Sequence, residues 1–168
     1  GERSQFSDPI NPSVGIMIDG IDFSNMGTIA HLTDLDQVEV LRGPQGTRFG
    51  ANGLAGLIAI KSRDPEPAAS VNIKANVTSF SGRSLSATVN QPVSDATQVR
   101  LSLSKETSDG FYDNLHLNTD DTNGINETYA RVKILNTGET YQALVTLLHA
   151  NVQNGFDAFS LDNTLNTL

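Results

Sequence analysis

The chain contains no cysteine and no tryptophan among its 168 residues. Without cysteine it can form no disulfide, no cysteine-based zinc site and no thiol nucleophile. Basic residues are scarce as well, since 11 Lys and Arg stand against 19 Asp and Glu, for a formal net charge of -8. A nucleic-acid-binding domain should present a basic face, so we expect no nucleic-acid partner.

Long apolar runs are also missing. The longest one, interrupted only by glycine, extends from Gly53 to Ile60, well short of the roughly 20 residues that a membrane-spanning helix needs. The sequence begins at Gly1 and shows no N-terminal signal. Charged residues make up only 18% and aliphatic residues are well represented, which argues against wholesale disorder.

No group of residues with the spacing of a catalytic, metal or nucleotide site is visible. The glycine-rich segment lacks the lysine of a phosphate-binding loop, and no G-x-S-x-G elbow occurs. The acidic segment between Lys105 and Arg131 lacks the EF-hand spacing, which favours a solvated loop over a calcium site. No histidine pair has metal-ligand spacing; the three histidines are His31, His116 and His149. The sequence therefore shows no catalytic constellation, and we expect no cofactor and no metal.

The pattern of apolar and polar residues changes near Pro65-Glu66-Pro67. Before this point we expect short mixed elements, because β-branched and apolar runs are closed by turn pairs such as Asp19-Gly20 and Gly43-Pro44. Strands are predicted at Val14 to Ile18, Val38 to Leu41 and Leu57 to Ser62, with one helical turn at Thr28 to Leu32.

Glycines are concentrated between the second and third of these predicted strands. Five occur within fourteen residues, at Gly43, Gly46, Gly50, Gly53 and Gly56. Glycine permits positive φ and close approach of backbones. The segment is therefore predicted to form compact, irregular backbone with tight turns.

After Pro67 the apolar residues recur with a period of two, which predicts antiparallel strands. In four strands the apolar positions carry no charge, and Ser, Thr and Asn occupy most of the alternate positions. A fifth run, Thr140 to Val152, is too apolar for its faces to be assigned. A soluble antiparallel sheet can alternate in this way. The strand lengths and the lipid-out, polar-in pattern nevertheless favour an outer-membrane barrel.

The connections between these strands support the same interpretation. They are short except for residues 106–127, and barrels of this kind have short periplasmic turns and long extracellular loops. Aromatic residues near the predicted strand ends, including Phe80, Tyr129 and Tyr141, are typical of an aromatic girdle. The isolated His149 is expected to line the inside of such a barrel.

Three segments resemble the plug domain of TonB-dependent outer-membrane receptors. They are Val14-Gly15-Ile16-Met17-Ile18-Asp19-Gly20, the stretch from Leu35 to Gly50 that contains Val40-Leu41-Arg42-Gly43-Pro44, and the stretch from Gly53 to Pro65. The resemblance implies an α+β plug segment, the C-terminal part of the plug, over residues 1–65. Residues 66–168 are then the first five or so strands of an antiparallel transmembrane β-barrel, which is incomplete, so that the chain is a fragment.

The resemblance also implies a function, which is that of a transport receptor and not of an enzyme. Such a receptor lies in the cell outer membrane of a Gram-negative bacterium, in contact with its lipid, and takes up a scarce nutrient with energy delivered by TonB. TonB would bind an N-terminal box that this chain lacks. The commonest nutrient in the family is a ferric siderophore. Uptake of carbohydrate or another complex stays open, as does a different class, a soluble β-rich binding module.

The resemblance further implies roles for individual residues. An apical plug loop contacts substrate, and the corresponding residues here are Phe23, Asn25 and Met26; the alternative is that they only pack the loop. Glu39 and Arg42 are expected to form ion pairs with the barrel wall. The alternative for this pair is an exposed contact worth about 0–1 kcal/mol.

Overall fold

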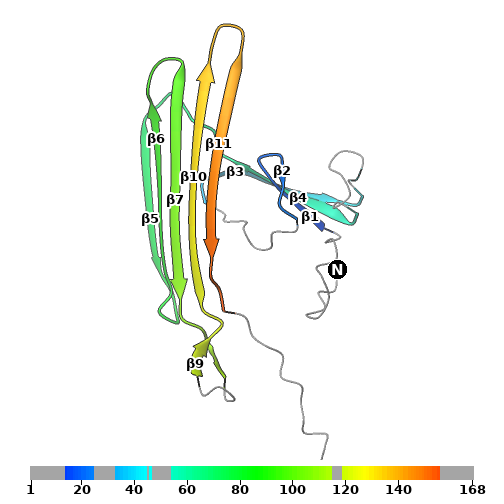
Figure 1. Cartoon of the computed structure of the whole chain (residues 1–168), viewed down its shortest axis with the longest axis vertical. Coiled ribbons are helices and arrows are strands. Elements are labelled where there is room, and N and C mark those ends of the chain that lie inside the picture. The colour runs from blue at the N-terminus through cyan, green and yellow to red at the C-terminus, as the bar shows by residue number, and fades with distance from the viewer. Residues whose placement is uncertain (1–13, 25–32, 45, 47–53, 115–118, 156–168) are drawn as a thin grey trace, which may run out of the picture.

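The computed structural model describes residues 14–24, 33–44, 46, 54–114 and 119–155. Within them eleven strands form a four-stranded sheet, a five-stranded sheet and a two-stranded hairpin (Figure 1). Residues 63–69 connect the two larger sheets, between the end of β4 and the beginning of β5.

The N-terminal sheet has the strand order β2-β1-β4-β3. β1 pairs with β4 in parallel, while β1–β2 and β3–β4 are antiparallel. The bounds are β1 Val14–Ile18, β2 Ile21–Asp22, β3 Leu35–Arg42 and β4 Gly56–Ser62. The three strands predicted in this region are therefore confirmed, and β3 is longer than expected.

Local backbone geometry explains where these strands end. Asp19 and Gly20 both have positive φ, at 49° and 83°, and turn the chain from β1 into β2. Gly43, at φ 87°, ends β3. A Cβ on Gly56 would lie 2.7 Å from the carbonyl oxygen of Leu41, so β3 and β4 pair here only because residue 56 lacks a side chain.

The helical part of the expected α+β segment is small in the part of the chain that the structure describes, where only Gly46 has helical conformation. The helical turn predicted at Thr28 to Leu32 lies outside the described residues. The apolar core is small too, with Ile18, Leu57 and Ile60 buried in the N-terminal sheet.

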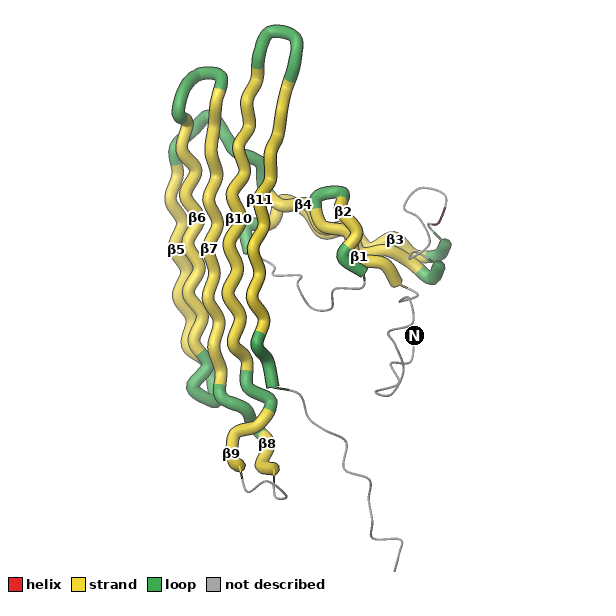
Figure 2. The backbone as a smooth tube through the Cα atoms, in the orientation of Figure 1, coloured by secondary structure: helices red, strands yellow, loops and turns green. Residues whose placement is uncertain are grey.

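The five-stranded sheet is antiparallel throughout, in the order β11-β10-β7-β6-β5. Its long strands lie side by side in Figure 2. The bounds are β5 Ser70–Val77, β6 Arg83–Pro92, β7 Thr97–Ser108, β10 Ile125–Thr137 and β11 Gln142–Val152. All five strands predicted after Pro67 are confirmed.

A hairpin occupies part of the connection expected to be a long loop at 106–127. It consists of β8 Tyr112–Asn114 and β9 Thr119–Thr122. The segment was predicted without strands because it is acidic and has no run of alternating apolar residues. In addition, β7 and β10 extend further toward the hairpin than the apolar alternation indicated.

Strand register divides the five-stranded sheet into an apolar face and a polar face. Across β7 and β10, Leu101 pairs with Val132 on one face and Ser102 pairs with Arg131 on the other. The register of β11 assigns its faces, which the sequence left open, since Val145 pairs with Ile134 and Thr146 with Lys133. The apolar face is exposed, with Val71, Ile73 and Leu147 each more than 60% exposed.

Two expectations about single residues are wrong. Tyr129 lies on the polar face and is only 2% exposed, because the Arg131 guanidinium donates a hydrogen bond to its hydroxyl. It therefore belongs to no girdle. His149 pairs with Ala130 on the apolar face rather than lining the polar side. The sequence indicates which residues of β11 share a face with His149, but only the register with β10 shows whether that face is the apolar or the polar one.

The N-terminal sheet lies on the side of the five-stranded sheet where β10 and β11 are found (Figures 1 and 2). The linker between the sheets is held by Asn90, which is 1% exposed. Its amide donates to the carbonyl oxygens of Glu66 and Ala68 and accepts from the Glu66 N–H. Among the described residues, no helix is long and apolar enough to cross a membrane.

Candidate functional site

Three carboxylates gather at one end of the N-terminal sheet because of its topology. β1 and β4 are parallel, so the residues that follow them, Asp19 and Asp64, lie at the same end. β3 is antiparallel to β4, so Asp34, which precedes β3, lies there as well. We call Asp19, Asp34 and Asp64 the loop carboxylates. This end of the sheet faces the polar side of β7 and β10.

Asp34 is bound most fully. Its carboxylate accepts two hydrogen bonds from the guanidinium of Arg100, at 2.6 Å from Nη2 and 2.7 Å from Nε, and a third at 2.7 Å from the hydroxyl of Ser102. The side chains of Asp34 and Arg100 are each 6% exposed. A two-pronged pair of this kind fixes both distance and orientation. Asp34 also has a positive φ of 58°, which the surrounding bonds must stabilise.

Arg131 holds the backbone on which Asp34 sits. Its Nη2 donates to the carbonyl oxygens of Thr33 and Asp34, both at 3.0 Å. The same nitrogen lies 3.7 Å from the Asp34 carboxylate. Nη1 donates to the hydroxyl of Tyr129, and the guanidinium carbon lies 5.6 Å from the centre of that ring. Arg131 therefore connects β10 to the start of β3.

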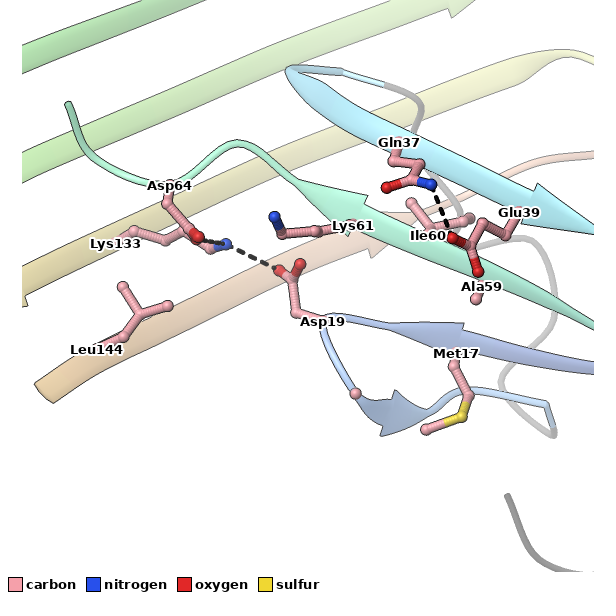
Figure 3. A pocket seen from close by; sticks show the side chains of 11 residues that line it. Met17, Asp19, Gln37, Glu39, Ala59, Ile60, Lys61, Asp64, Lys133 and Leu144 are labelled. Atoms are coloured by element: carbon pink, nitrogen blue, oxygen red, sulfur yellow. Dashed lines mark hydrogen bonds and ion pairs between the residues drawn. The ribbon is translucent and has the colours of Figure 1, made fainter. Parts of the chain in front are cut away.

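Lys133 binds the other two loop carboxylates. Its ammonium lies 2.8 Å from Asp64 and 3.4 Å from Asp19, and it donates to the Ser62 carbonyl oxygen at 3.3 Å (Figure 3). Asp19 in turn accepts from the N–H and the hydroxyl of Ser62, at 2.8 and 2.6 Å. Lys133 is 2% exposed, although Asp64 remains 42% exposed. The contact therefore joins a buried cation on the five-stranded sheet to a carboxylate that is partly accessible to solvent.

The three cations, which we call the strand cations, form one patch on the polar face. Arg100 and Lys133 are directly opposite each other on β7 and β10, and Arg131 lies two residues from Lys133. Like charges directly opposite across strands destabilise a sheet. The loop carboxylates offset this repulsion, and removing one partner of a buried pair is strongly destabilising.

The pKa of Asp34 shows whether burial or the neighbouring hydrogen bonds and cations have the larger effect on this carboxyl. Burial by itself raises the pKa of this carboxyl. The hydrogen bonds from Arg100 and Ser102, together with the positive charges of Arg100 and Arg131, outweigh burial and lower the pKa below its ordinary value of 3.8. The carboxylate is consequently ionised at neutral pH, as the pairing with Arg100 requires.

A cavity of about 380 Å³ lies beside the Lys133 contact, between the N-terminal sheet and the strands β10 and β11 (Figure 3). Asp19, Glu39, Lys61, Asp64 and Lys133 contribute charge to its lining. Its apolar lining is made by Met17, Ala59, Ile60 and Leu144. The cavity is thus bounded by both sheets.

Of the sequence-predicted residues that the structure describes, none belongs to the loop carboxylates or the strand cations, although Glu39 lines the cavity beside Lys133. Phe23 is half-buried, and its N–H donates to the carbonyl oxygen of Ile16 at 2.8 Å. Asn25 and Met26 lie outside the described residues. Glu39 and Arg42 are exposed on β3, and Glu39 accepts a hydrogen bond from Gln37. Within the described part of the chain neither is paired with the five-stranded sheet, so their contact with a barrel wall stays a prediction.

The predicted turn glycines fall into three groups. Gly43 and Gly56 have the positive φ and the close backbone approach described above. A Cβ on Gly46 would meet nothing within 4 Å. Gly50 and Gly53 lie outside the described residues.

The loop carboxylates and the strand cations together form what we call the inter-sheet cluster. The sequence did not predict this cluster. The available signal was the presence of Arg100, Arg131 and Lys133 at alternate positions otherwise filled mostly by Ser, Thr and Asn. Long cations on such a face require carboxylate partners, but the sequence does not say which of 19 acidic residues supply them. In the described ranges, no group of three or more His, Cys, Asp or Glu is placed to hold a metal ion.

Comparison with known proteins identifies relatives for most of the chain. Residues 4–57 match the sequence family described as TonB-dependent Receptor Plug Domain. The chain is 30% identical over 132 residues to the pesticin receptor of Yersinia pestis, covering 78% of this chain and 20% of that protein. It is 35% identical over 95 residues to the catecholate siderophore receptor Fiu of Escherichia coli K12, covering 56% of this chain and 12% of the relative.

Known structures give the same result. The crystal structure of the ferric yersiniabactin uptake receptor FyuA from Yersinia pestis aligns with a TM-score of 0.72 at 29% identity, over 77% of this chain and 21% of that one. The ferric-catecholate import receptor Fiu from E. coli K12, in its open form, aligns with a TM-score of 0.67 at 25% identity, over 83% and 20%. The chain spans about a fifth of the length of the curated receptors that match it over 132 residues.

Proposed function

Because the chain belongs to the TonB-dependent receptors and spans the region of their plug domain, we propose that it is part of a receptor for energy-coupled uptake of a ferric siderophore. The named relatives support the substrate class, since they are described as receptors for pesticin, for catecholate siderophores and for ferric yersiniabactin. None of these descriptions is of an enzyme. We place the receptor in the outer membrane of a Gram-negative bacterium, where TonB-dependent receptors reside.

We assign residues 1–65 to the C-terminal part of the plug and residues 66–168 to the beginning of the barrel wall. The family match over residues 4–57 supports the first assignment. The five-stranded sheet supports the second, because its apolar face is exposed and uncharged in the middle of its strands. An outer-membrane strand meets lipid with such a face. Outer-membrane lipid is accordingly one partner, and the TonB complex, acting on the plug, is another.

The observation that carries this proposal is the contact between the two sheets. The polar face of the five-stranded sheet meets the N-terminal sheet through buried ion pairs, while its apolar face has no protein covering in the described residues. A soluble sheet buries its apolar face instead. A sheet that presents apolar residues outward and binds a domain on its polar side fits a barrel wall around a plug.

Two sets of residues have roles that we propose on this basis. Phe23, Asn25 and Met26 belong to the apical loop that contacts the iron chelate. Glu39 and Arg42 are exposed on β3, where they are free to pair with further strands of the wall. Replacing Asn25 or Met26 by alanine should weaken chelate binding, whereas Gln37→Ala on β3 should not.

Uptake by the full-length receptor tests the function. Cells lacking their own siderophore receptors would express it, with and without TonB, and take up ⁵⁵Fe presented as catecholate, hydroxamate and carboxylate complexes; labelled oligosaccharides form a parallel panel. We expect accumulation of at least one iron complex that requires TonB. Accumulation of an oligosaccharide alone, or accumulation that does not depend on TonB, would overturn the proposal.

A further inference from the structure

The strand cations form a charged patch whose composition is not explained by attachment of the plug alone. Arg100, Arg131 and Lys133 occupy adjacent positions of β7 and β10, and Arg100 faces Lys133 directly. Replacing a buried ion pair by apolar residues of similar volume is often neutral or stabilising. A contact needed only to hold two sheets together would therefore not require three neighbouring cations on one of them.

The division of charge between the sheets is complete. All three carboxylates of the cluster belong to the N-terminal sheet, and all three cations belong to the five-stranded sheet. If the loop carboxylates move away, three neighbouring cations are left without counter-charges on the polar face. Such a patch is a ready site for a ligand with several anionic oxygens.

The surroundings on the polar face favour an anion at this place. The neighbours of the strand cations on that face are uncharged: Thr88, Asn90, Gln98, Ser102, Ser104, Tyr129, Leu135, Thr146 and Leu148. Of the charged residues farther along it, Lys74 on β5 is a fourth cation. The two carboxylates on this face, Glu106 and Glu127, are cross-strand neighbours in the register of β7 and β10. They lie at the opposite end of these strands, next to the β8–β9 hairpin.

The contact between the sheets is also of a kind that can be opened. It includes hydrogen bonds and ion pairs from the β1–β2 turn and from the segments flanking β3 and β4. Asp64 is already 42% exposed and borders the 380 Å³ cavity. Water or an anionic ligand can thus reach the Lys133 end of the cluster before the bonds of Asp34 are disturbed.

We propose that the strand cations Arg100, Arg131 and Lys133 are a transit site for an anionic ferric chelate, which the loop carboxylates Asp19, Asp34 and Asp64 occupy at rest. The inference rests on the proposed function, because it needs a chelate and a force that displaces the N-terminal sheet. Displacement exchanges protein carboxylates for the phenolate or carboxylate oxygens of the chelate. The cations stay paired throughout, and the chelate is drawn toward the space that the plug leaves.

Two variants of the full-length receptor distinguish a role of Lys133 in passage of the chelate from a role in holding the plug. Asp19→Asn combined with Asp64→Asn removes both carboxylates that pair with Lys133 and leaves the cation in place. Adding Lys133→Gln to these two changes removes the cation as well. If Lys133 serves only to hold the plug, the two variants behave alike, because both have lost the same ion pairs.

Uptake of the anionic ferric complex of 2,3-dihydroxybenzoate supplies the first measurement. We expect the variant that lacks Lys133 to take up ⁵⁵Fe about tenfold more slowly than the variant that keeps it, with equal binding at the cell surface. Equal rates for the two variants would overturn the inference while leaving the proposed function intact. Absence of uptake by the wild-type receptor would count against the proposed function, and the second measurement then decides the inference.

The second measurement needs no substrate. The purified full-length receptor is placed in a planar bilayer with a KCl gradient, and urea is added to unfold the plug and open the pore. We expect the reversal potential of Arg131→Gln combined with Lys133→Gln to shift toward cation selectivity relative to wild type. Lys74→Gln, on the same face of β5 and outside the cluster, should shift it less. An unshifted potential in the double variant would refute the transit site.

Discussion

At the scale of the residue, Asp34 is the centre of the contact between the two sheets. It receives three hydrogen bonds at its carboxylate, and its carbonyl oxygen accepts a fourth from Arg131. Asp36, two residues away, pairs with Lys61 at 3.0 Å, but both side chains are about half exposed. Loss of the carboxylate should therefore affect stability differently at the two positions. Without Asp34 the cation Arg100 stays buried and unpaired, whereas without Asp36 the cation Lys61 is still solvated.

Replacing Asp34 by asparagine should destabilise attachment of the N-terminal sheet by about 3–5 kcal/mol, since Arg100 stays buried without its counter-charge. Urea titration of the full-length receptor, with pulse proteolysis to detect release of the N-terminal region, measures this change. Asp36→Asn is the matched control and should have little effect, because its pair with Lys61 is exposed to solvent. Equal effects at the two positions would contradict the assignment of Asp34 as the central contact.

Attachment should also depend on pH in a defined direction. The pKa of Asp34 is lowered in the folded protein from 3.8, so its stabilising contribution is complete above that ordinary value. The contribution is lost as the pH falls through the lowered folded value, because protonation removes the charge that Arg100 binds. The same urea titration repeated down to acidic pH should show this loss in wild type. Asp34→Asn should lack that component, and an identical acid dependence in both proteins would rule out the mechanism.

At the scale of the element, the strands were predictable and their partners were not. The period of two after Pro67 identified β5, β6, β7, β10 and β11, because one face is apolar and the other polar. The faces of β11 could not be predicted, since Leu144 and Leu148 lie on the polar face and Val145 and Leu147 on the apolar one. Only the register with β10 distinguishes the two sets.

The N-terminal sheet was predictable for a different reason, namely its turn residues. Asp19-Gly20 and Gly43 mark the strand ends through positive φ. Which acidic residues meet the second sheet depends on the parallel pairing of β1 with β4 across more than 35 intervening residues, and no local pattern specifies that pairing. This is why the loop carboxylates were missed, whereas the roles expected of Glu39 and Arg42 came from the resemblance to the receptor family.

The pairing of β3 with β4 depends on Gly56, and its substitution tests this. Gly56→Ala would place a Cβ 2.7 Å from the Leu41 carbonyl oxygen, a backbone atom that cannot move aside cheaply. We expect a loss of about 1–3 kcal/mol in stability of the N-terminal sheet, measured by thermal unfolding of the full-length receptor. Gly46→Ala, where a Cβ meets nothing within 4 Å, should be close to neutral. If both variants unfold like wild type, the close approach at Gly56 is not limiting.

At the scale of the whole molecule, the two faces of the five-stranded sheet determine what each side meets. The polar face binds the N-terminal sheet through the inter-sheet cluster, and the apolar face is exposed. Exposed Val71, Ile73 and Leu147 would make a soluble protein prone to association, whereas they are suited to lipid. The relatives show the same fold within far larger chains, so lipid and further strands complete the environment of this sheet in the proposed receptor.

Neighbouring residues of β5 allow a test with an internal control. Ile73 lies on the apolar face and Asn72 on the polar face, and both are exposed. Ile73→Arg should lower the amount of full-length receptor assembled in the outer membrane, because a charge at the lipid-facing midplane costs about 2–4 kcal/mol. Asn72→Arg should assemble normally. Heat-modifiable mobility of the assembled protein on gels is the readout, and equal assembly of the two variants would refute the assigned faces.

The measurement that bears most directly on the central claim is the accessibility of β5 in the membrane. Spin labels placed one at a time at residues 71–76 of the full-length receptor would be examined for collision with oxygen, which concentrates in lipid, and with a water-soluble nickel complex. We expect oxygen accessibility to alternate with a period of two, high at Val71, Ile73 and Ala75 and low at Asn72, Lys74 and Asn76. A flat profile, or one in which the polar positions face lipid, would contradict a barrel wall that carries the plug on its polar side.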